Sequence, residues 1–180
     1  MATLSRTSRK EEDMKAITDK HEIEKVQAEL LPRLINDWAL ITVGTPEDWN
    51  TMTIAWGSMG DMWWQPVVNC WVTPARYTYE FLERHGSFTV SFFPAEYHDD
   101  LMTLGTKSGR DGDKVALTKL TPKMLEGAVT FEEADTTLVC EKIYAQPLDP
   151  AAIPEEFMEE YYRDMPPHAH FMGKVAQVLK

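Results

Sequence analysis

The sequence predicts a mainly β protein with short helices and an N-terminal helical arm. Beyond Asp37 the chain consists of short runs rich in β-branched and aromatic residues, and turn residues separate these runs. Short strands of this kind indicate an antiparallel sheet or barrel. The first 36 residues differ from the rest, because they combine seven basic and seven acidic side chains with a helix-type apolar spacing.

The length of 180 residues, with 43% hydrophobic and 26% charged side chains, fits one globular domain with a short arm. We therefore divide the chain into an arm, residues 1–36, and a domain, residues 37–180. The first ten residues are expected to be disordered, and a helix is expected from about Glu12 to Leu31, where Pro32 would end it. A narrow apolar stripe on this helix could dock on the domain or on a second subunit, and it consists of Ile17, Ile23, Val26 and Leu30.

The net charge of -11 excludes some classes of partner. Since the arm is balanced in charge, the excess of acidic groups lies in residues 37–180. Sequence-independent binding of DNA or RNA needs an excess of Lys and Arg, and an anionic membrane surface would also repel this chain. No apolar run approaches the ~20 residues that a membrane span needs, and the start of the chain is polar rather than a signal peptide. We expect a soluble, cytoplasmic protein.

Seven strands are predicted in the domain. Turn signals between them include Gly44 with Pro46, Gly60 with Asp61, and the segment Gly105–Gly112. The predicted strands are 38–43, 51–58, 67–73, 87–93, 128–132, 137–146 and 171–179.

Three short helices are predicted between the strands, and each follows a proline. They begin after Pro74, after Pro94 and after Pro154. The acid-rich stretch Glu155–Asp164 in the third is expected to be a solvated face, or else a docking face for a basic redox protein.

Five of the six tryptophans lie between Trp49 and Trp71. Aromatic residues at this density fill a barrel core, form a dimer interface, or wall a planar ligand. Trp63 and Trp64 are adjacent in a turn context, so at least one of them is predicted to face solvent and to have a partner.

Two further segments have the residue types of an anion site. Thr73–Thr78 joins a strand end to a helix start, where free backbone amides, hydroxyl groups and Arg76 favour an anion; simple helix capping is the alternative. Gly105–Lys114 combines glycines, hydroxyl groups and cations in a loop that suits a phosphate; a solvated loop closed by Asp–Lys pairs is the alternative.

Together these segments resemble the flavin reductase-like family, whose members fold as an FMN-binding split β-barrel and include the flavoredoxins. The resemblance depends on three motifs in the family's order, which are Asn50–Gly57 (NTMTIAWG), Pro74–Thr78 (PARYT) and Ser108–Lys114 (SGRDGDK). It covers the chain from about Asp37 onward and leaves the arm outside.

The resemblance implies FMN bound at a homodimer interface. It implies that the phosphate lies near Arg76, Thr78 and the Ser108–Lys114 loop, and that Asn50–Thr53 passes beside the ribityl chain and the polar edge of the ring. The FMN-binding residues that it implies are Asn50, Thr51, Met52, Thr53, Arg76, Tyr77, Thr78, Ser108, Arg110 and Lys114.

The implied activity is that of a flavoprotein oxidoreductase of the flavin reductase type. It would accept hydride from NADH or NADPH and pass electrons to free flavin or another acceptor, such as a redox protein. The cofactor supplies the redox chemistry, so no catalytic side chain is assigned. The chain has no GxGxxG fingerprint, so the nicotinamide is expected to stack on the flavin, with Trp63, Trp64 or Tyr161 beside it. The alternatives are a non-enzymatic flavin- or haem-binding split-barrel protein and a structural dimerisation module.

No metal site is predicted. His168 and His170 could project to one face of a strand, but no third metal ligand has informative spacing. The preferred interpretation is a histidine near the flavin or the dimer interface. Such a histidine could donate a proton to a reduced product. Cys70 and Cys140 have no CxxC spacing and are expected to be buried, reduced thiols.

Overall fold

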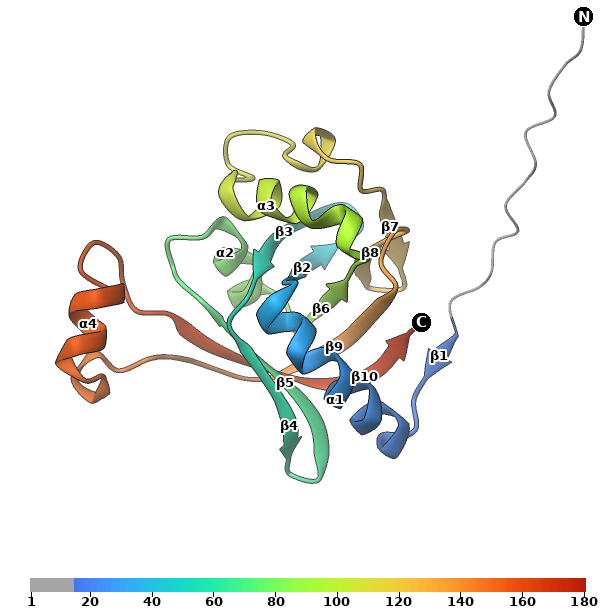
Figure 1. The fold of residues 1–180 in the computed structure, drawn as a ribbon, viewed down its shortest axis with the longest axis horizontal. Coiled ribbons are helices and arrows are strands. Elements are labelled where there is room, and N and C mark those ends of the chain that lie inside the picture. The colour runs from blue at the N-terminus through green and yellow to red at the C-terminus, as the bar shows by residue number, and fades with distance from the viewer. Residues whose placement is uncertain (1–14) are drawn as a thin grey trace, which may run out of the picture.

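A computed structural model of the chain describes residues 15–180 and shows a curved antiparallel sheet with short helices around it (Figure 1). The sheet has the strand order β3-β2-β6-β9-β10-β5-β4, and β1 pairs with β10. Its strands are β1 (Ala16–Ile17), β2 (Ala39–Thr45), β3 (Asp48–Ile54), β4 (Gly57–Met62), β5 (Gln65–Val72), β6 (Ser87–Phe92), β9 (Thr136–Pro147) and β10 (Ala169–Leu179). A second sheet pairs β7 (Pro122–Leu125) with β8 (Ala128–Phe131).

The barrel is open on one side. Strands β3 and β4 follow each other in sequence, yet they are the two ends of the sheet path and do not pair with each other in the described part of the chain. Ala55 and Trp56 lie between them, outside either strand. The fold class predicted from the sequence, a mainly β split barrel, is therefore confirmed.

The inner face of the sheet carries the main hydrophobic core. Phe88, Phe92 and Phe171 are among its fully or almost fully buried side chains. Gly173 on β10 is required for this packing, because a Cβ atom there would lie 2.4 Å from Cζ of Phe88. The predicted buried thiols are confirmed, since Cys70 and Cys140 are free and lie in this core.

Helix α1 (Lys20–Asn36) differs from the predicted helix in both its ends. Its N-cap is Asp19, whose side chain accepts a hydrogen bond from the Glu22 amide at 3.1 Å. Pro32 lies inside the helix, contrary to the prediction, and the fully buried Leu34 follows it. The helix ends where Trp38 adopts a φ of 68° and stacks on His98. Residues 1–14, which include the expected disordered segment and the expected helix start, lie outside the described residues.

The apolar stripe of this helix packs on the barrel itself. Ile23, Val26 and Leu30 are buried in the main core, so of the two docking sites considered the structure shows the domain. Ile17 is not on the helix, because it belongs to β1 and pairs with Val178.

The predicted strand 51–58 is wrong as a single element, because the chain leaves β3 at Ala55 and starts β4 at Gly57. The predicted break at Gly60 and Asp61 is also wrong, because both residues lie within β4. Strands β1 and β7 were not predicted; both are short, and β7 includes Pro122.

The reversal between β4 and β5 instead occurs at Trp63 and Trp64. Both have left-handed φ values, 55° and 59°, in a two-residue turn closed by the Met62 and Gln65 pair. Such turns normally select Asn-Gly, so two tryptophans here are costly to the backbone. Their side chains are 62% and 83% exposed, which confirms the prediction that at least one faces solvent. We refer to residues 57–72 as the β4–β5 hairpin, which extends beyond the body of the barrel (Figure 1).

The three predicted helices are all present. They are α2 (Tyr77–Arg84), α3 (His98–Thr106), which a 3-10 turn (Ala95–Tyr97) precedes, and α4 (Glu155–Tyr161). Helix α4 lies in the excursion between β9 and β10, away from the barrel, and buries none of its residues, as a solvated face requires (Figure 1). No helix of residues 15–180 is long and apolar enough to cross a membrane.

Candidate functional site

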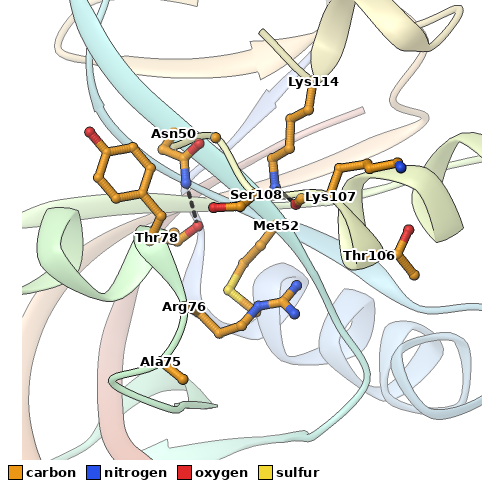
Figure 2. Close-up of a pocket in the computed structure, with 11 residues that line it drawn as sticks. Asn50, Met52, Ala75, Arg76, Thr78, Thr106, Lys107, Ser108 and Lys114 are labelled. Atoms are coloured by element: carbon orange, nitrogen blue, oxygen red, sulfur yellow. Dashed lines mark hydrogen bonds between the residues drawn. The ribbon is translucent and has the colours of Figure 1, made fainter. Parts of the chain in front are cut away.

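The motifs of β3, of the start of α2 and of the loop after α3 meet at one small cavity (Figure 2). The cavity has a volume of about 100 Å³. Of the described residues that line it none is acidic, and they are Asn50, Met52, Ala75, Arg76, Tyr77, Thr78, Thr106, Lys107, Ser108, Gly109 and Lys114. We call it the anion cavity.

Two cations define the electrostatics of this cavity. The ammonium group of Lys114, whose residue is only 5% exposed, donates to the carbonyl oxygens of Leu104 at 2.8 Å and Lys107 at 3.2 Å. Arg76 donates to the carbonyl oxygen of Gly105. Both cations therefore lie at the carbonyl end of α3, where the helix dipole favours positive charge.

Burial destabilises the charged forms of Arg76 and Lys114. Burial, followed by the repulsion from Arg76, lowers the pKa of Lys114 to about 8. Burial also lowers the pKa of Arg76. Each shift shows that the positive form is destabilised at the site, which an anion in the cavity would reverse.

Hydroxyl groups from two motifs face the same space. Thr78 on α2 accepts a hydrogen bond from Asn50 Nδ2 at 2.8 Å, and this bond joins the first motif to the second (Figure 2). Ser108 Oγ accepts a hydrogen bond from the Arg110 backbone amide at 3.2 Å. Seven of the ten residues assigned from the sequence line the cavity, namely Asn50, Met52, Arg76, Tyr77, Thr78, Ser108 and Lys114.

The other three assigned residues, Thr51, Thr53 and Arg110, do not line the anion cavity. Arg110 pairs with Glu80 and lies over the Tyr77 ring at 4.9 Å, so it does not line the anion cavity. Thr51 is fully buried and bonds to Thr42 at 2.9 Å. Thr53 donates to the carbonyl oxygen of Leu101 at 2.5 Å. The hydroxyl groups of Thr51 and Thr53 thus have hydrogen-bond partners within the protein.

A second, larger cavity adjoins the first along β3. It has a volume of about 260 Å³ and shares Met52 with the anion cavity. Strand β3 is an edge of the sheet, so every second backbone N–H and C=O along it points away from β2. The wall is mainly apolar and aromatic, and it consists of Met52, Thr53, Ile54, Ala55, Trp56, Trp71, Met165 and His168. We call it the aromatic cavity.

The two histidines do not share a site. His168 lies before β10, lines the aromatic cavity, and its Nδ1 is 3.1 Å from the Tyr162 hydroxyl. His170 lies on β10 and bonds through Nε2 to Oδ1 of Asn69 at 2.8 Å. Burial lowers the pKa of both imidazoles. Within residues 15–180 no cluster of three or more His, Cys, Asp or Glu residues could hold a metal ion.

The residues assigned from the sequence omit four wall residues, which are Ala75, Thr106, Lys107 and Gly109. Lys107 had a signal, since it is one of the cations of the Gly105–Lys114 loop. Gly109 had a signal, since a glycine in a cation-rich loop often permits close approach. A Cβ atom at Gly109 would lie 2.4 Å from Asn50 Oδ1, so the loop is pressed onto β3. Ala75 and Thr106 have no such signal, because only the fold brings the two helix ends together.

Comparison with known proteins points in the same direction as this geometry. The family described as flavin reductase like domain has a model that matches residues 31–178. None of the curated proteins matches the chain.

Solved structures share the fold at low sequence identity. An FMN-binding protein from Thermus thermophilus with bound 1-cyclohex-2-enone is 22% identical, with a TM-score of 0.62 over 78% of this chain and 68% of that chain. A flavoredoxin from Methanosarcina acetivorans is 21% identical, with a TM-score of 0.60 over 79% and 67% of the two chains. The styrene monooxygenase flavin reductase from Pseudomonas putida S12 is 17% identical, with a TM-score of 0.58 over 85% and 84%.

Proposed function

The chain belongs to the flavin reductase-like domain family, and from this membership and the two cavities we propose that it is an FMN-binding oxidoreductase. It accepts hydride from NADH or NADPH and passes electrons to free flavin or another acceptor. The observation that carries the proposal is the anion cavity, which holds Arg76 and the buried Lys114 without a carboxylate and opens beside an aromatic cavity.

The residues present fit the phosphate of FMN. A phosphate brings two negative charges and three acceptor oxygens, and Arg76, Lys114, Thr78 and Ser108 offer cations and hydroxyl donors to it. The lowered pKa of Lys114 supports this assignment, because a buried ammonium without a carboxylate partner is stabilised when an anion binds.

The aromatic cavity is assigned to the flavin ring. Met52 is common to both cavities, so the ribityl chain would run past it along the edge of β3. Backbone groups of that edge, rather than the engaged hydroxyls of Thr51 and Thr53, would then bond to the ribityl chain and the ring. Trp56 and Trp71 supply flat apolar surface for the ring.

When bound, FMN supplies the redox chemistry, and the protein binds and orients it. His168 is the titratable side chain in the wall of the aromatic cavity. The Tyr162 hydroxyl holds its Nδ1, and burial keeps the imidazole neutral at pH 7 because it lowers the pKa. We assign to His168 the holding of a proton beside the ring.

The nicotinamide is assigned to the open side of the aromatic cavity. Trp56 is 48% exposed there, and its ring meets that of Tyr161 edge to face at 5.6 Å. These two rings form an apolar rim on which a second flat group can stack.

The proposal includes a homodimer. Between Asp48 and Arg76 the one charged side chain is Asp61, and Lys20 neutralises it at 2.8 Å. A segment with a single, neutralised charge and exposed tryptophans has the composition of an interface core, and it suits two copies of a chain whose net charge is -11.

Anaerobic titration tests the activity. The purified protein is loaded with FMN, and flavin absorbance is followed as NADH or NADPH is added without oxygen. The proposal predicts bleaching by at least one of the two nucleotides and recovery of the colour when an acceptor is added. A protein that binds FMN but is not bleached by either would contradict the hydride step, and a protein that does not bind FMN would contradict the whole assignment.

A further inference from the structure

Asn50 was expected to contact the flavin directly, but its side-chain amide donates a hydrogen bond to Thr78. The donor nitrogen Nδ2 lies 2.8 Å from Thr78 Oγ1, and the two residues come from β3 and α2 (Figure 2). Asn50 is only 7% exposed and Thr78 only 1% exposed. A bond between two buried side chains at the wall of the anion cavity is shielded from water, so its direction matters.

The direction of this bond decides what the Thr78 hydroxyl can do. An amide nitrogen only donates, so Thr78 Oγ1 is the acceptor. The hydroxyl has a single proton, which the Asn50 bond leaves unused, and no described residue accepts it. Because Thr78 lines the anion cavity, the proton is available to an anion there.

The amide of Asn50 is held on its other side as well. Its oxygen Oδ1 lies against Gly109, where an added Cβ atom would approach to 2.4 Å. The amide group therefore sits between the loop after α3 and the start of α2, with its oxygen toward the loop and its nitrogen toward Thr78.

The Ser108 hydroxyl is, like that of Thr78, the acceptor in its hydrogen bond. Its Oγ accepts the backbone N–H of Arg110, which leaves the hydroxyl proton free in the same way. Arg76 and Lys114 are donors in any case. The cavity thus presents donors on several sides, and a group that carries only acceptor oxygens is the one that satisfies them.

We propose that Asn50 is a positioning residue, which acts through Thr78 to make the anion cavity a set of converging donors selective for a terminal, fully deprotonated phosphate. This inference rests on the proposed binding of FMN. It assigns Asn50 no contact with the flavin. The selectivity that it predicts is for FMN over riboflavin, which has a hydroxyl group, both donor and acceptor, where FMN has the phosphate.

The test is a double-mutant cycle on this selectivity. Dissociation constants for FMN and riboflavin are measured by fluorescence quenching for the wild type, Asn50→Leu, Thr78→Val and the double variant. Both substitutions keep the number and branching of the side-chain heavy atoms, and thermal unfolding of each variant checks that it is folded. Asn50→Leu frees the Thr78 hydroxyl to rotate, so we expect the ratio of riboflavin to FMN dissociation constants to fall about 10-fold.

In the Thr78→Val background the same Asn50→Leu change should alter the ratio by less than about 2-fold, because there is no hydroxyl left to position. An equal loss in both backgrounds, or an equal weakening of FMN and riboflavin, would show that Asn50 acts by direct contact and would overturn the inference. A wild type that does not prefer FMN to riboflavin would instead contradict the proposed function itself. Thr78→Ser, which keeps the hydroxyl, is the matched control and should retain the wild-type ratio.

Discussion

The ammonium group of Lys114 donates to the carbonyl oxygen of Leu104 at 2.8 Å, so a buried cation is fixed against the last turn of α3. The same side chain lines the anion cavity. One residue thus joins the end of a helix to the wall of the anion cavity.

Replacing Lys114 should weaken FMN selectively. Lys114→Met keeps most of the side-chain volume and removes one charge-assisted contact to the phosphate, which is worth about 1.5 to 3 kcal/mol. We expect the FMN dissociation constant to rise by the corresponding ~10- to 150-fold, with riboflavin changed little. Lys25→Met, which removes an exposed lysine on α1, is the control for net charge and should leave both constants unchanged. Equal weakening of both ligands by Lys114→Met would place the phosphate elsewhere.

FMN binding should take up protons above pH 8. The pKa of Lys114 is lowered to about 8 from an ordinary value of 10.5, and a bound phosphate raises it again. The phosphate itself is fully deprotonated in this range, since its second pKa is about 6. FMN affinity should therefore fall as pH rises from 8 toward 10, whereas riboflavin affinity should not. Calorimetry in buffers of different ionisation enthalpy measures the uptake directly, and Lys114→Arg should abolish it.

The same shift has a consequence for the protein without ligand. Between pH 8 and 10.5 the unfolded chain holds a proton on Lys114 that the folded chain has released. The contribution of this group to the free energy of unfolding therefore rises with pH across that window. Comparing urea denaturation of the wild type and Lys114→Met at pH 8 and pH 10 isolates the effect, and a contribution that falls with pH would show that the Lys114 pKa is not depressed.

Gly109→Ala should damage the site more than the fold. The added Cβ atom would lie 2.4 Å from Asn50 Oδ1 and 3.2 Å from a Tyr77 ring carbon, so the loop must move away from β3. We expect at least ~10-fold weaker FMN binding, because the loop carries Ser108 and Lys114, with a small change in melting temperature. Gly86→Ala is the matched control, since its Cβ atom would meet nothing within 4 Å. Unchanged FMN binding by Gly109→Ala would contradict the described loop position.

The tip of the β4–β5 hairpin gives a prediction about assembly. Trp63 and Trp64 adopt left-handed backbone conformations that Asn-Gly adopts at lower cost. The double substitution Trp63→Asn with Trp64→Gly should therefore stabilise the hairpin while removing its exposed rings. In analytical ultracentrifugation we expect the wild type to sediment as a dimer and this variant as a monomer. Ile35→Asn removes another exposed apolar side chain, 58% exposed on α1, and should stay dimeric. A variant that remains dimeric would show that the interface lies elsewhere.

The sequence was sufficient for the class of fold and for the regions of the site, because alternating apolar runs and proline-started helices are local signals. It failed where tertiary packing overrides local preference. Pro32 is expected to end a helix, but α1 continues beyond it so that Leu34 is buried in the core. The helix ends only before Trp38, which has a positive φ. Gly60 is a turn former, yet the reversal falls at two tryptophans that no turn preference would select.

For the site, the three motifs brought seven side chains to one cavity, but their directions were not predictable. The hydroxyl groups of Thr51 and Thr53 form hydrogen bonds within the protein, since a buried hydroxyl group needs a partner. Arg110 pairs with Glu80 on α2, and this pairing depends on how α2 and the loop after α3 lie relative to each other in the fold. The bond between Asn50 and Thr78 joins residues from two motifs and is visible only in the fold.

We propose that the anion cavity of this chain holds the phosphate of FMN. The most direct measurement compares wild-type dissociation constants for FMN and riboflavin under the same conditions, at pH 7.5 and moderate salt. With two cations and two hydroxyl donors on the phosphate, we expect FMN to bind at least ~100-fold tighter than riboflavin. Equal affinity for the two flavins would contradict it.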